Sequence, residues 1–390
     1  MNAQIATTED ILRKLVSFAN LGGESNLPIA RWIQKYLDSF KISHYEVPNK
    51  EGNKKGIHCR IGPPVDGGFI LSGHMDVVPV EGQNWETPPF ELTDKGDGNL
   101  YGRGACDMKG FLALCLQAIP AMLEADLQIP IYLAFTYDEE TGCEGAPPLI
   151  DHIQETYSEK PRYALIGEPT MMQPVIGQKG IFVLRTKIKG SAGHSSRVRQ
   201  EVSAIHEAAR AIFWLENKMD DLIREGRIDD RFDPPHSSIH VGTISGGIAT
   251  NVIADHTQFS WDVRVIPGDS ALDILEDFRQ YSRKREAELK SRYNDFRINT
   301  EIVHQPVPAL DTPEKSEILN IIQQLTGNQH WSAVSYATEA GQYANAGYEA
   351  IICGPGSIEQ AHRANEFISQ NQLRKGKNML DSLIRYCSRK

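Results

Sequence analysis

Five side chains that can bind metal ions follow apolar runs or lie in short loops of this sequence: His74, Asp107, Glu140, Glu168 and His362. Imidazole nitrogens and carboxylate oxygens are ligands for zinc and similar divalent ions. A site with two ions needs one carboxylate that bridges them, about two further ligands for each ion and an open position for water. The five residues have this composition, and we expect them to meet in one place.

Two more acids stand beside these residues. Asp76 lies two positions after His74, where its carboxylate can accept the proton on the other imidazole nitrogen and so fix the ring. Glu139 precedes Glu140 directly after an apolar run, so several carboxylates would crowd together unless cations compensate their charge. Each residue alone has an ordinary alternative, because a single His or Asp at a strand end is more often a cap, a turn former or a solvated side chain.

The elements that must position these side chains alternate between strands and helices. Apolar runs predict strands at 69–71, 129–136 and 163–166, and helical spacing of apolar residues predicts a helix at 108–125. This alternation is typical of an α/β fold with a mostly parallel sheet that is covered on both faces. In such sheets ligands bind at the carboxyl ends of the strands, which is where His74 and the acidic segments fall.

The block 181–305 has a different pattern, with a strand, a helix, two strands, a helix and a strand. This is the order of a ferredoxin-like α+β domain, and it predicts a domain inserted into the first one. The metal-binding catalytic domain would then be discontinuous, with residues 1–180 and 306–390. A length of 390 residues agrees with two domains that each bury a core.

Composition narrows the class of protein. With 40% hydrophobic and 24% charged residues the chain is globular, and a net charge of −10 disfavours nucleic acid and anionic membranes as partners. The six cysteines form no CxxC pair, which favours reduced thiols, and Cys106 is more typical of a small buried side chain than of a ligand. No secretory leader pattern is recognised, and no stretch approaches the roughly 18 apolar residues of a membrane span, so we expect a cytoplasmic protein.

Five ordered segments between residues 72 and 362 carry a resemblance to a known family: SGHMDVVP, YGRGACDMKG, FTYDEETG, IGEPT and GPGSIEQAH. They resemble the signature blocks of the co-catalytic metallopeptidases and deacylases, which include acetylornithine deacetylases, succinyl-diaminopimelate desuccinylases, glutamate carboxypeptidases and aminoacylases. The resemblance implies a homodimer in which the inserted domain serves as lid and dimerisation module.

The resemblance also implies a role for each candidate residue. His74 and Glu168 would bind one metal ion and Glu140 and His362 the other, with Asp107 as the bridge. Asp76 would orient His74, and Glu139 would be the general base that takes a proton from the attacking water and passes it to the leaving amine. Zinc is the expected ion, with cobalt or manganese as alternatives that suit the same ligands.

Two segments of the inserted block resemble family motifs for the substrate. GSAGHSS implies that His194 stabilises the oxyanion, commonly in the partner subunit's site, although it could be an ordinary loop histidine. ISGGIATNVIAD and WDVRVIP imply that Asn251 and Arg264 hold the substrate carboxylate, for which the fork of an arginine is suited. Arg264 could equally pair with Asp262 on its own strand.

Two further segments bear on the substrate. The GPGS turn offers backbone N–H groups at Gly354, Gly356 and Ser357 that could bind a carboxylate or oxyanion, or could form a plain turn. YATEA, residues 336–340, is similar to the acetylornithine deacetylase subgroup, and Glu339 could attract a cationic substrate side chain or be a surface acid.

The function implied by the resemblance is hydrolysis of N2-acetyl-L-ornithine to L-ornithine and acetate, a step of arginine biosynthesis. The alternatives are deacylation of another N-acyl amino acid, such as acetylcitrulline or succinyl-diaminopimelate, and a dipeptidase activity. An alternative outside the enzymes is a non-catalytic binding protein of the same fold. Such a protein should lack one of the metal ligands or the general base.

Overall fold

The structure, a computed structural model, describes residues 6–389 and divides the chain into two compact units. The first consists of the described residues of Met1–Gly177, Leu310–Ala333 and Thr338–Lys390, and the second of Gln178–Ala309 and Val334–Ala337. The second unit therefore begins and ends a few residues outside the block expected from the sequence, and it takes a short segment from the C-terminal part.

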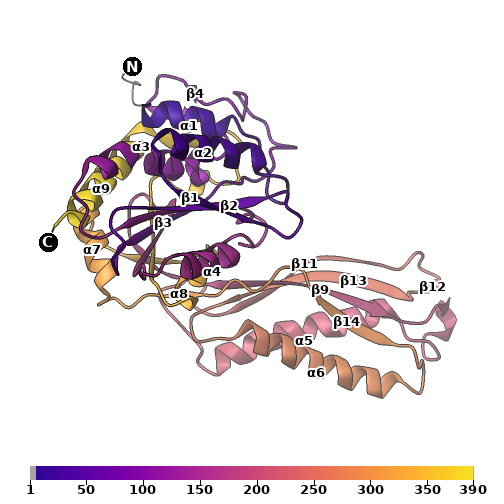
Figure 1. Cartoon of the computed structure of the whole chain (residues 1–390). Helices are drawn as coiled ribbons and strands as arrows, with labels where there is room; N and C mark the ends of the chain where they lie inside the picture. The colour runs from indigo at the N-terminus through magenta and orange to yellow at the C-terminus, as the bar shows by residue number, and fades with distance from the viewer. Residues whose placement is uncertain (1–5, 390) are drawn as a thin grey trace. The chain divides into compact units, whose positions relative to one another are not determined.

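A sheet of nine strands in the described part of the chain forms the centre of the first unit (Figure 1). Its strands lie in the order β1-β2-β6-β3-β7-β17-β8-β15, and β16 pairs with β8. The strands β6, β3, β7 and β17 are parallel neighbours, whereas β1 and β2 add antiparallel strands at one edge. The expected α/β class with a mostly parallel central sheet is confirmed. The bounds are β1 (His44–Pro48), β2 (Lys55–Ile61), β3 (Phe69–His74), β6 (Ile131–Thr136), β7 (Tyr163–Pro169), β8 (Val175–Gln178), β15 (Leu310–Asp311), β16 (Ser332–Val334) and β17 (Glu349–Gly354).

Helices cover both faces of this sheet, with α1, α2 and α3 on one side and α4 on the other in Figure 1. Their bounds are α1 (Thr8–Val16), α2 (Leu27–Ser39), α3 (Gly110–Glu124), α4 (Ala146–Thr156), α7 (Glu317–Thr326), α8 (Ala340–Asn345) and α9 (Gln370–Cys387). The stretch Ala105–Glu124, which includes α3, is long and apolar enough to cross a membrane, contrary to the expectation from the sequence. Because 78% of its apolar window is buried inside the fold, it is placed as a core helix.

The central strands are buried on both faces, which explains their unbroken apolar sequences. Every residue of β3, β6 and β7 is buried. A strand covered by helices on both sides has no solvent-facing alternation, so its first polar residues appear where it ends. His74 is the last residue of β3, and Glu168 is next to last in β7.

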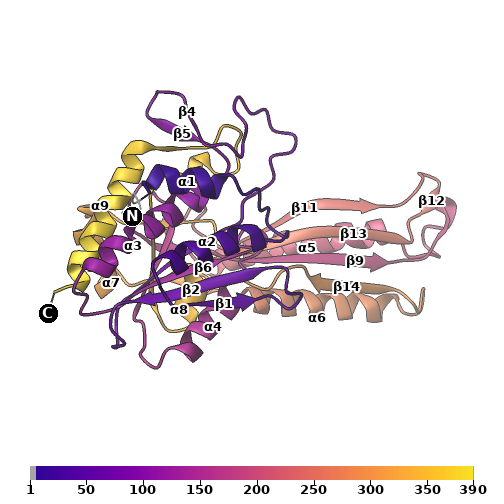
Figure 2. The ribbon, with the colours of Figure 1, turned by 45° about the horizontal axis from the view of Figure 1, so that its top comes forward.

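The second unit has the ferredoxin-like arrangement that the sequence predicts. Its four-stranded antiparallel sheet has the order β11-β13-β9-β14, and α5 and α6 pack against it (Figures 1 and 2). Alternate residues of β9 and β13 are buried, as expected of a sheet with one face covered. The bounds are β9 (Gly180–Lys189), α5 (Ala204–Arg224), β11 (Ser238–Gly246), β13 (His256–Val265), α6 (Ala271–Leu289) and β14 (Arg297–Ile302), with a small pair formed by β10 (Gly193–His194) and β12 (Val252–Ile253).

Candidate metal centre

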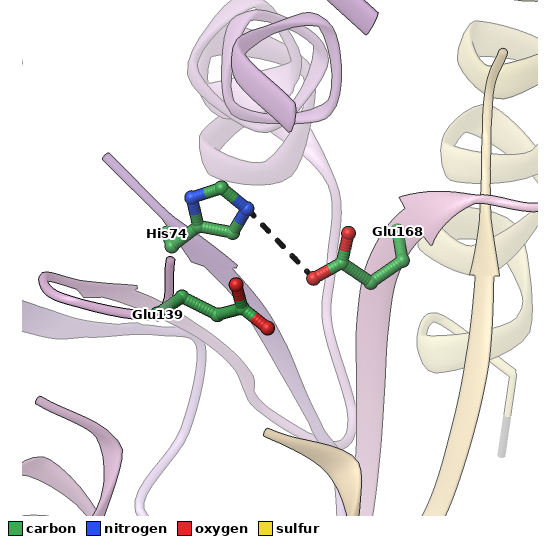
Figure 3. A group of neighbouring side chains, drawn as sticks. All are labelled: His74, Glu139 and Glu168. Atoms are coloured by element: carbon green, nitrogen blue, oxygen red, sulfur yellow. Dashed lines mark ion pairs between the residues drawn. The ribbon is translucent and has the colours of Figure 1, made fainter. Parts of the chain in front are cut away.

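Three of the predicted ligands meet at the carboxyl end of the central sheet. Nε2 of His74 lies 3.2 Å from Oδ1 of Asp107 and 3.8 Å from Oε1 of Glu168. All three side chains are buried. Figure 3 shows the His74 ring and the Glu168 carboxylate facing each other, with the carboxylate of Glu139 turned toward the same space.

A second group of ligands lies on the other side of Asp107. Nε2 of His362 is 3.0 Å from Oε2 of Glu140 and 3.8 Å from Oδ2 of Asp107. The two oxygens of Asp107 therefore face different histidines. This is the arrangement required of a carboxylate that bridges two ions.

The loop that carries Asp107 is held by Glu366, a buried acid that the sequence did not single out. Its Oε1 accepts hydrogen bonds from the backbone N–H groups of Cys106 and Asp107 at 2.8 and 3.0 Å. Its Oε2 accepts from Gly104 N–H at 2.9 Å and from Arg103 Nη1 at 2.8 Å. The loop thus receives its shape from a residue more than 250 positions away, and no spacing in the sequence signals this partner.

Asp76 acts differently from the prediction. Nδ1 of His74 lies 2.9 Å from the backbone carbonyl oxygen of Asp76 but 3.6 Å from its carboxylate, so the carbonyl is the acceptor that fixes the ring. The carboxylate instead accepts the backbone N–H groups of Glu139 and Glu140 at 3.3 and 3.2 Å. Asp76 therefore ties the His74 turn to the loop that carries both glutamates.

Glu139 lies among the potential ligands as well as near the position expected of a base. One of its carboxylate oxygens lies within 4.8 Å of ligand atoms of His74 and Glu168. The thiol of Cys143 donates to Oε1 of Glu139 at 3.5 Å. The loop is further anchored by Asp138, which pairs with Lys54 and accepts Gly23 N–H at 2.8 Å. The contacts of Asp138 were not foreseen, because each joins segments far apart in the sequence.

Without bound cations, the site holds more carboxylates than positive charges to balance them. Burial raises the pKa of Glu139 and of Glu168 well above the ordinary value, and neighbouring carboxylates raise it further. Burial, followed by the charge of Asp107, also raises the pKa of Glu140. Burial alone would raise the pKa of Asp107, but the hydrogen bond from His74 and the charges of His74 and His362 together outweigh burial and lower it. Bound cations would relieve this repulsion and favour the ionised carboxylates.

The residues present fit divalent ions. Two ligands on one tetrahedral ion with bonds of about 2.1 Å lie roughly 3.4 Å apart. The ligand separations of 3.0 to 3.8 Å around Asp107 agree with this spacing. In addition, Oε1 of Glu168 is buried and has no hydrogen-bond partner among the described residues. A metal ion would satisfy this oxygen, which is otherwise costly to bury.

Two of the three N–H groups that the GPGS turn was expected to offer are already bonded within the fold. Gly354 N–H donates to Thr170 Oγ1 at 3.2 Å, and Gly356 N–H donates to Gln372 Oε1 at 3.3 Å. Ser357 caps a short 3₁₀ turn through its side chain. Gly354 is required for close packing, since a Cβ there would lie 2.1 Å from the carbonyl oxygen of Gly167. The turn therefore holds β17 against the end of β7.

Glu339 is a buried residue and not a surface acid. It is 1% exposed, and its Oε2 accepts a hydrogen bond from Ser72 Oγ at 3.3 Å, two residues before His74. Burial raises the pKa of Glu339 to about 7. Because the side chain is enclosed beneath the end of β3, direct contact with a substrate amine is not supported by its position.

His194 and Asn251 come together in the second unit. β10 pairs with β12 next to both residues, and Ser195 N–H donates to the Asn251 carbonyl at 3.0 Å. The exposed ring of His194 accepts Ser196 N–H on Nδ1 at 3.3 Å. A neutral ring that accepts on Nδ1 carries its proton on Nε2.

Arg264 lies on β13 of the four-stranded sheet, near the end of this strand that is farther from Asn251. It is 3.6 Å from Asp262 and donates to Ser335 O at 3.3 Å, so the pairing considered as its alternative does form. His256, near the Asn251 end, and Arg264 are eight residues apart on β13, which is on the order of 25 Å along an extended strand. Asn251 and Arg264 of one chain therefore cannot hold the same carboxylate.

The chain is similar over nearly its whole length to proteins named acetylornithine deacetylase. It is 31% identical to an acetylornithine deacetylase of Proteus mirabilis over 392 residues, covering 98% of this chain and 97% of that protein. It is 32% identical to an acetylornithine deacetylase of Pasteurella multocida, covering 94% of this chain and 92% of the relative.

Solved structures show the same fold at lower identity. A tripeptidase from Staphylococcus aureus superposes with a TM-score of 0.76 at 18% identity, covering 98% of both chains. A family M20 metallo-carboxypeptidase from Sulfolobus solfataricus gives a TM-score of 0.76 at 15% identity, covering 98% of this chain and 99% of that one. Residues 70–386 match the Peptidase family M20/M25/M40. Since this match includes most of the chain and both ligand groups, the chain belongs to the Peptidase family M20/M25/M40.

Proposed function

We propose that the chain is an amidohydrolase that removes the acetyl group of N2-acetyl-L-ornithine to give L-ornithine and acetate. The observation that carries the hydrolytic part is the pair of ligand groups that share Asp107, with Glu139 beside them. The choice of substrate is supported by near-full-length similarity to relatives named acetylornithine deacetylases.

The protein's residues have distinct tasks in this proposal. His74 and Glu168 hold one divalent ion, Glu140 and His362 hold the other, and Asp107 contacts both. When bound, the ions polarise the acyl carbonyl and lower the pKa of water, and zinc suits the donor set. Glu139 accepts the proton of the attacking water and donates it to the leaving amine.

A substrate panel tests the assignment. The purified chain, loaded with zinc, cobalt or manganese, is assayed against acetylornithine, acetylcitrulline, succinyl-diaminopimelate and unblocked dipeptides. We expect the highest kcat/KM for acetylornithine. Preference for another acyl amino acid would reject the substrate while retaining the reaction, and cleavage of dipeptides alone would reject deacylation.

We further propose that the enzyme is a cytoplasmic homodimer whose second unit contributes to the partner's site. Two features of that unit support a second copy. The edge strand β11 is largely exposed and includes Ile244, which is 55% exposed, and nearby Ile248 is 88% exposed. In addition, Asn251 and Arg264 can serve one substrate only if they come from different chains.

Subunit complementation tests the dimer. The variants N251A and R264A should each be nearly inactive, but mixing and re-equilibrating them should restore roughly a quarter of wild-type activity, because half of the subunits pair as heterodimers with one intact site. A mixture that stays as inactive as its components would contradict a site shared between chains.

A further inference from the structure

His362 is the exposed member of the ligand set. Its side chain is 59% exposed, whereas those of Asp107 and Glu140 are 9% and 7% exposed. Its backbone also adopts a left-handed conformation, with φ of 63°, which is uncommon for residues other than glycine. Packing alone therefore does not hold this histidine, and other contacts must fix the position of its ring.

Gln83 supplies such a contact from a loop outside every recognised motif. Its side-chain Nε2 donates to the backbone carbonyl oxygen of His362 at 2.9 Å. The other end of the same amide accepts two hydrogen bonds, from Arg103 Nη2 at 2.6 Å and from Trp85 Nε1 at 3.1 Å. With its oxygen held by two donors, the amide can present only its NH₂ group to His362.

The contact continues into the buried part of the site. Arg103, which holds the oxygen of Gln83, is 1% exposed and also pairs with Glu366 at 2.8 Å. Glu366 in turn accepts the N–H groups of the loop that carries Asp107. A continuous set of hydrogen bonds thus runs from the bridging aspartate to the exposed histidine. A second bond, from Glu86 N–H to Asn365 Oδ1 at 2.8 Å, joins the same two loops.

We infer that Gln83 is a positioning residue for the ion held by Glu140 and His362, and that it acts on this ion and not on the one held by His74 and Glu168. The inference rests on the proposed two-metal function. Gln83 touches only the backbone of His362, so its effect is on the placement of the ring and not on its chemistry. Loss of a residue that orients a metal ligand commonly lowers metal affinity about 10- to 100-fold.

Two variants remove the contact in different ways. Q83E keeps an acceptor for Arg103 and Trp85 but cannot donate to His362, and Q83M keeps the length of the side chain without any amide. Zinc is titrated into the metal-free full-length variants in competition with a chromophoric chelator, which yields both dissociation constants without any substrate. We expect both variants to weaken one ion about 10-fold or more and to leave the other unchanged.

The H362A background identifies the affected ion. If the inference holds, Q83M in that background leaves the affinity of the remaining ion unchanged, whereas in an H74A background it still weakens the ion that remains. The matched control is Q128M, because the amide of Gln128 also donates to a backbone carbonyl, that of Asp126, away from the site. Its zinc affinities should equal those of the wild type.

The outcomes separate this inference from the function on which it rests. If the wild type binds two ions and Q83M and Q83E bind both as tightly, or weaken both equally, the role of Gln83 is rejected and the function is untouched. If the wild type binds fewer than two ions, both are rejected. If it binds two ions but hydrolyses no acyl amide, only the proposed function is rejected.

Discussion

Replacing Glu366 by glutamine should destabilise the first unit strongly, although the two side chains have nearly the same shape. The carboxylate accepts four hydrogen bonds, two on each oxygen, from Arg103 and from the N–H groups of residues 104, 106 and 107. A glutamine has only one acceptor oxygen, so in either amide orientation two buried donors lose their acceptor and face an NH₂ group.

The size of the effect follows from these contacts. A buried donor that loses its partner costs about 1–3 kcal/mol, and a buried ion pair that loses one charge costs about 3–5 kcal/mol. Glu366 and Arg103 are both 1% exposed, so water cannot replace the missing acceptor. Because these contributions overlap, we expect E366Q to lower the free energy of unfolding by about 3–5 kcal/mol.

Urea-induced unfolding of the metal-free chain measures this change. Circular dichroism and tryptophan fluorescence are recorded together, since the two units can unfold in separate transitions. The control is E359Q, the same chemical change at an exposed glutamate of the loop that carries His362. A decrease below about 1 kcal/mol for E366Q, or an equal decrease for E359Q, would refute the account of this buried acceptor.

Three other changes have defined outcomes. E139Q should lower kcat by about 10²–10⁴-fold, because an amide cannot accept the proton of water. Its zinc content should stay at the wild-type value. An active variant would show that another group is the base. Dialysis against a chelator should abolish hydrolysis and lower the melting temperature, since ions that bind only the folded protein stabilise it. Adding zinc back should restore both the activity and the melting temperature. An enzyme that is insensitive to the chelator would contradict the metal centre. Burial and then the nearby His152 lower the pKa of His58 to about 3 from 6.5, so the unfolded chain binds this proton first as the pH falls. Stability should therefore decrease by about 2 kcal/mol between pH 7 and pH 5, and less in H58F; equal pH slopes for the two proteins would contradict this role of His58.

The candidate ligands could be found from the sequence because polar residues at strand ends are visible in it. β3 and β7 are buried on both faces, so His74 and Glu168 stand out directly against apolar neighbours. Local signals were equally readable. Thr7 and Asp10 form the capping box at the start of α1 that their spacing of three residues predicts.

The partners of these ligands could not be found in the same way. Glu366 accepts hydrogen bonds from backbone N–H groups, and an acid from any part of the chain could do this if the fold placed it there. Glu339 is buried because the start of α8 packs against β3, where Ser72 donates a hydrogen bond to it. The local sequence around Glu339 does not encode this long-range contact. The separation of Asn251 from Arg264 follows from the register of β13 with its neighbours, and single-chain motifs do not reveal it.

The order of strands in the first unit also has a consequence for synthesis of the chain. β17 lies between β7 and β8, although 179 residues separate the end of β7 from the start of β17. At about 5–20 residues per second, a ribosome would need roughly 10–40 s to make this interval. During that time the growing chain would present β7 as an uncovered, apolar strand edge, which is a site for association with other chains. The second unit is almost continuous in sequence and can form its sheet within the same interval. A nascent chain arrested before residue 349 is therefore the form most in need of a chaperone.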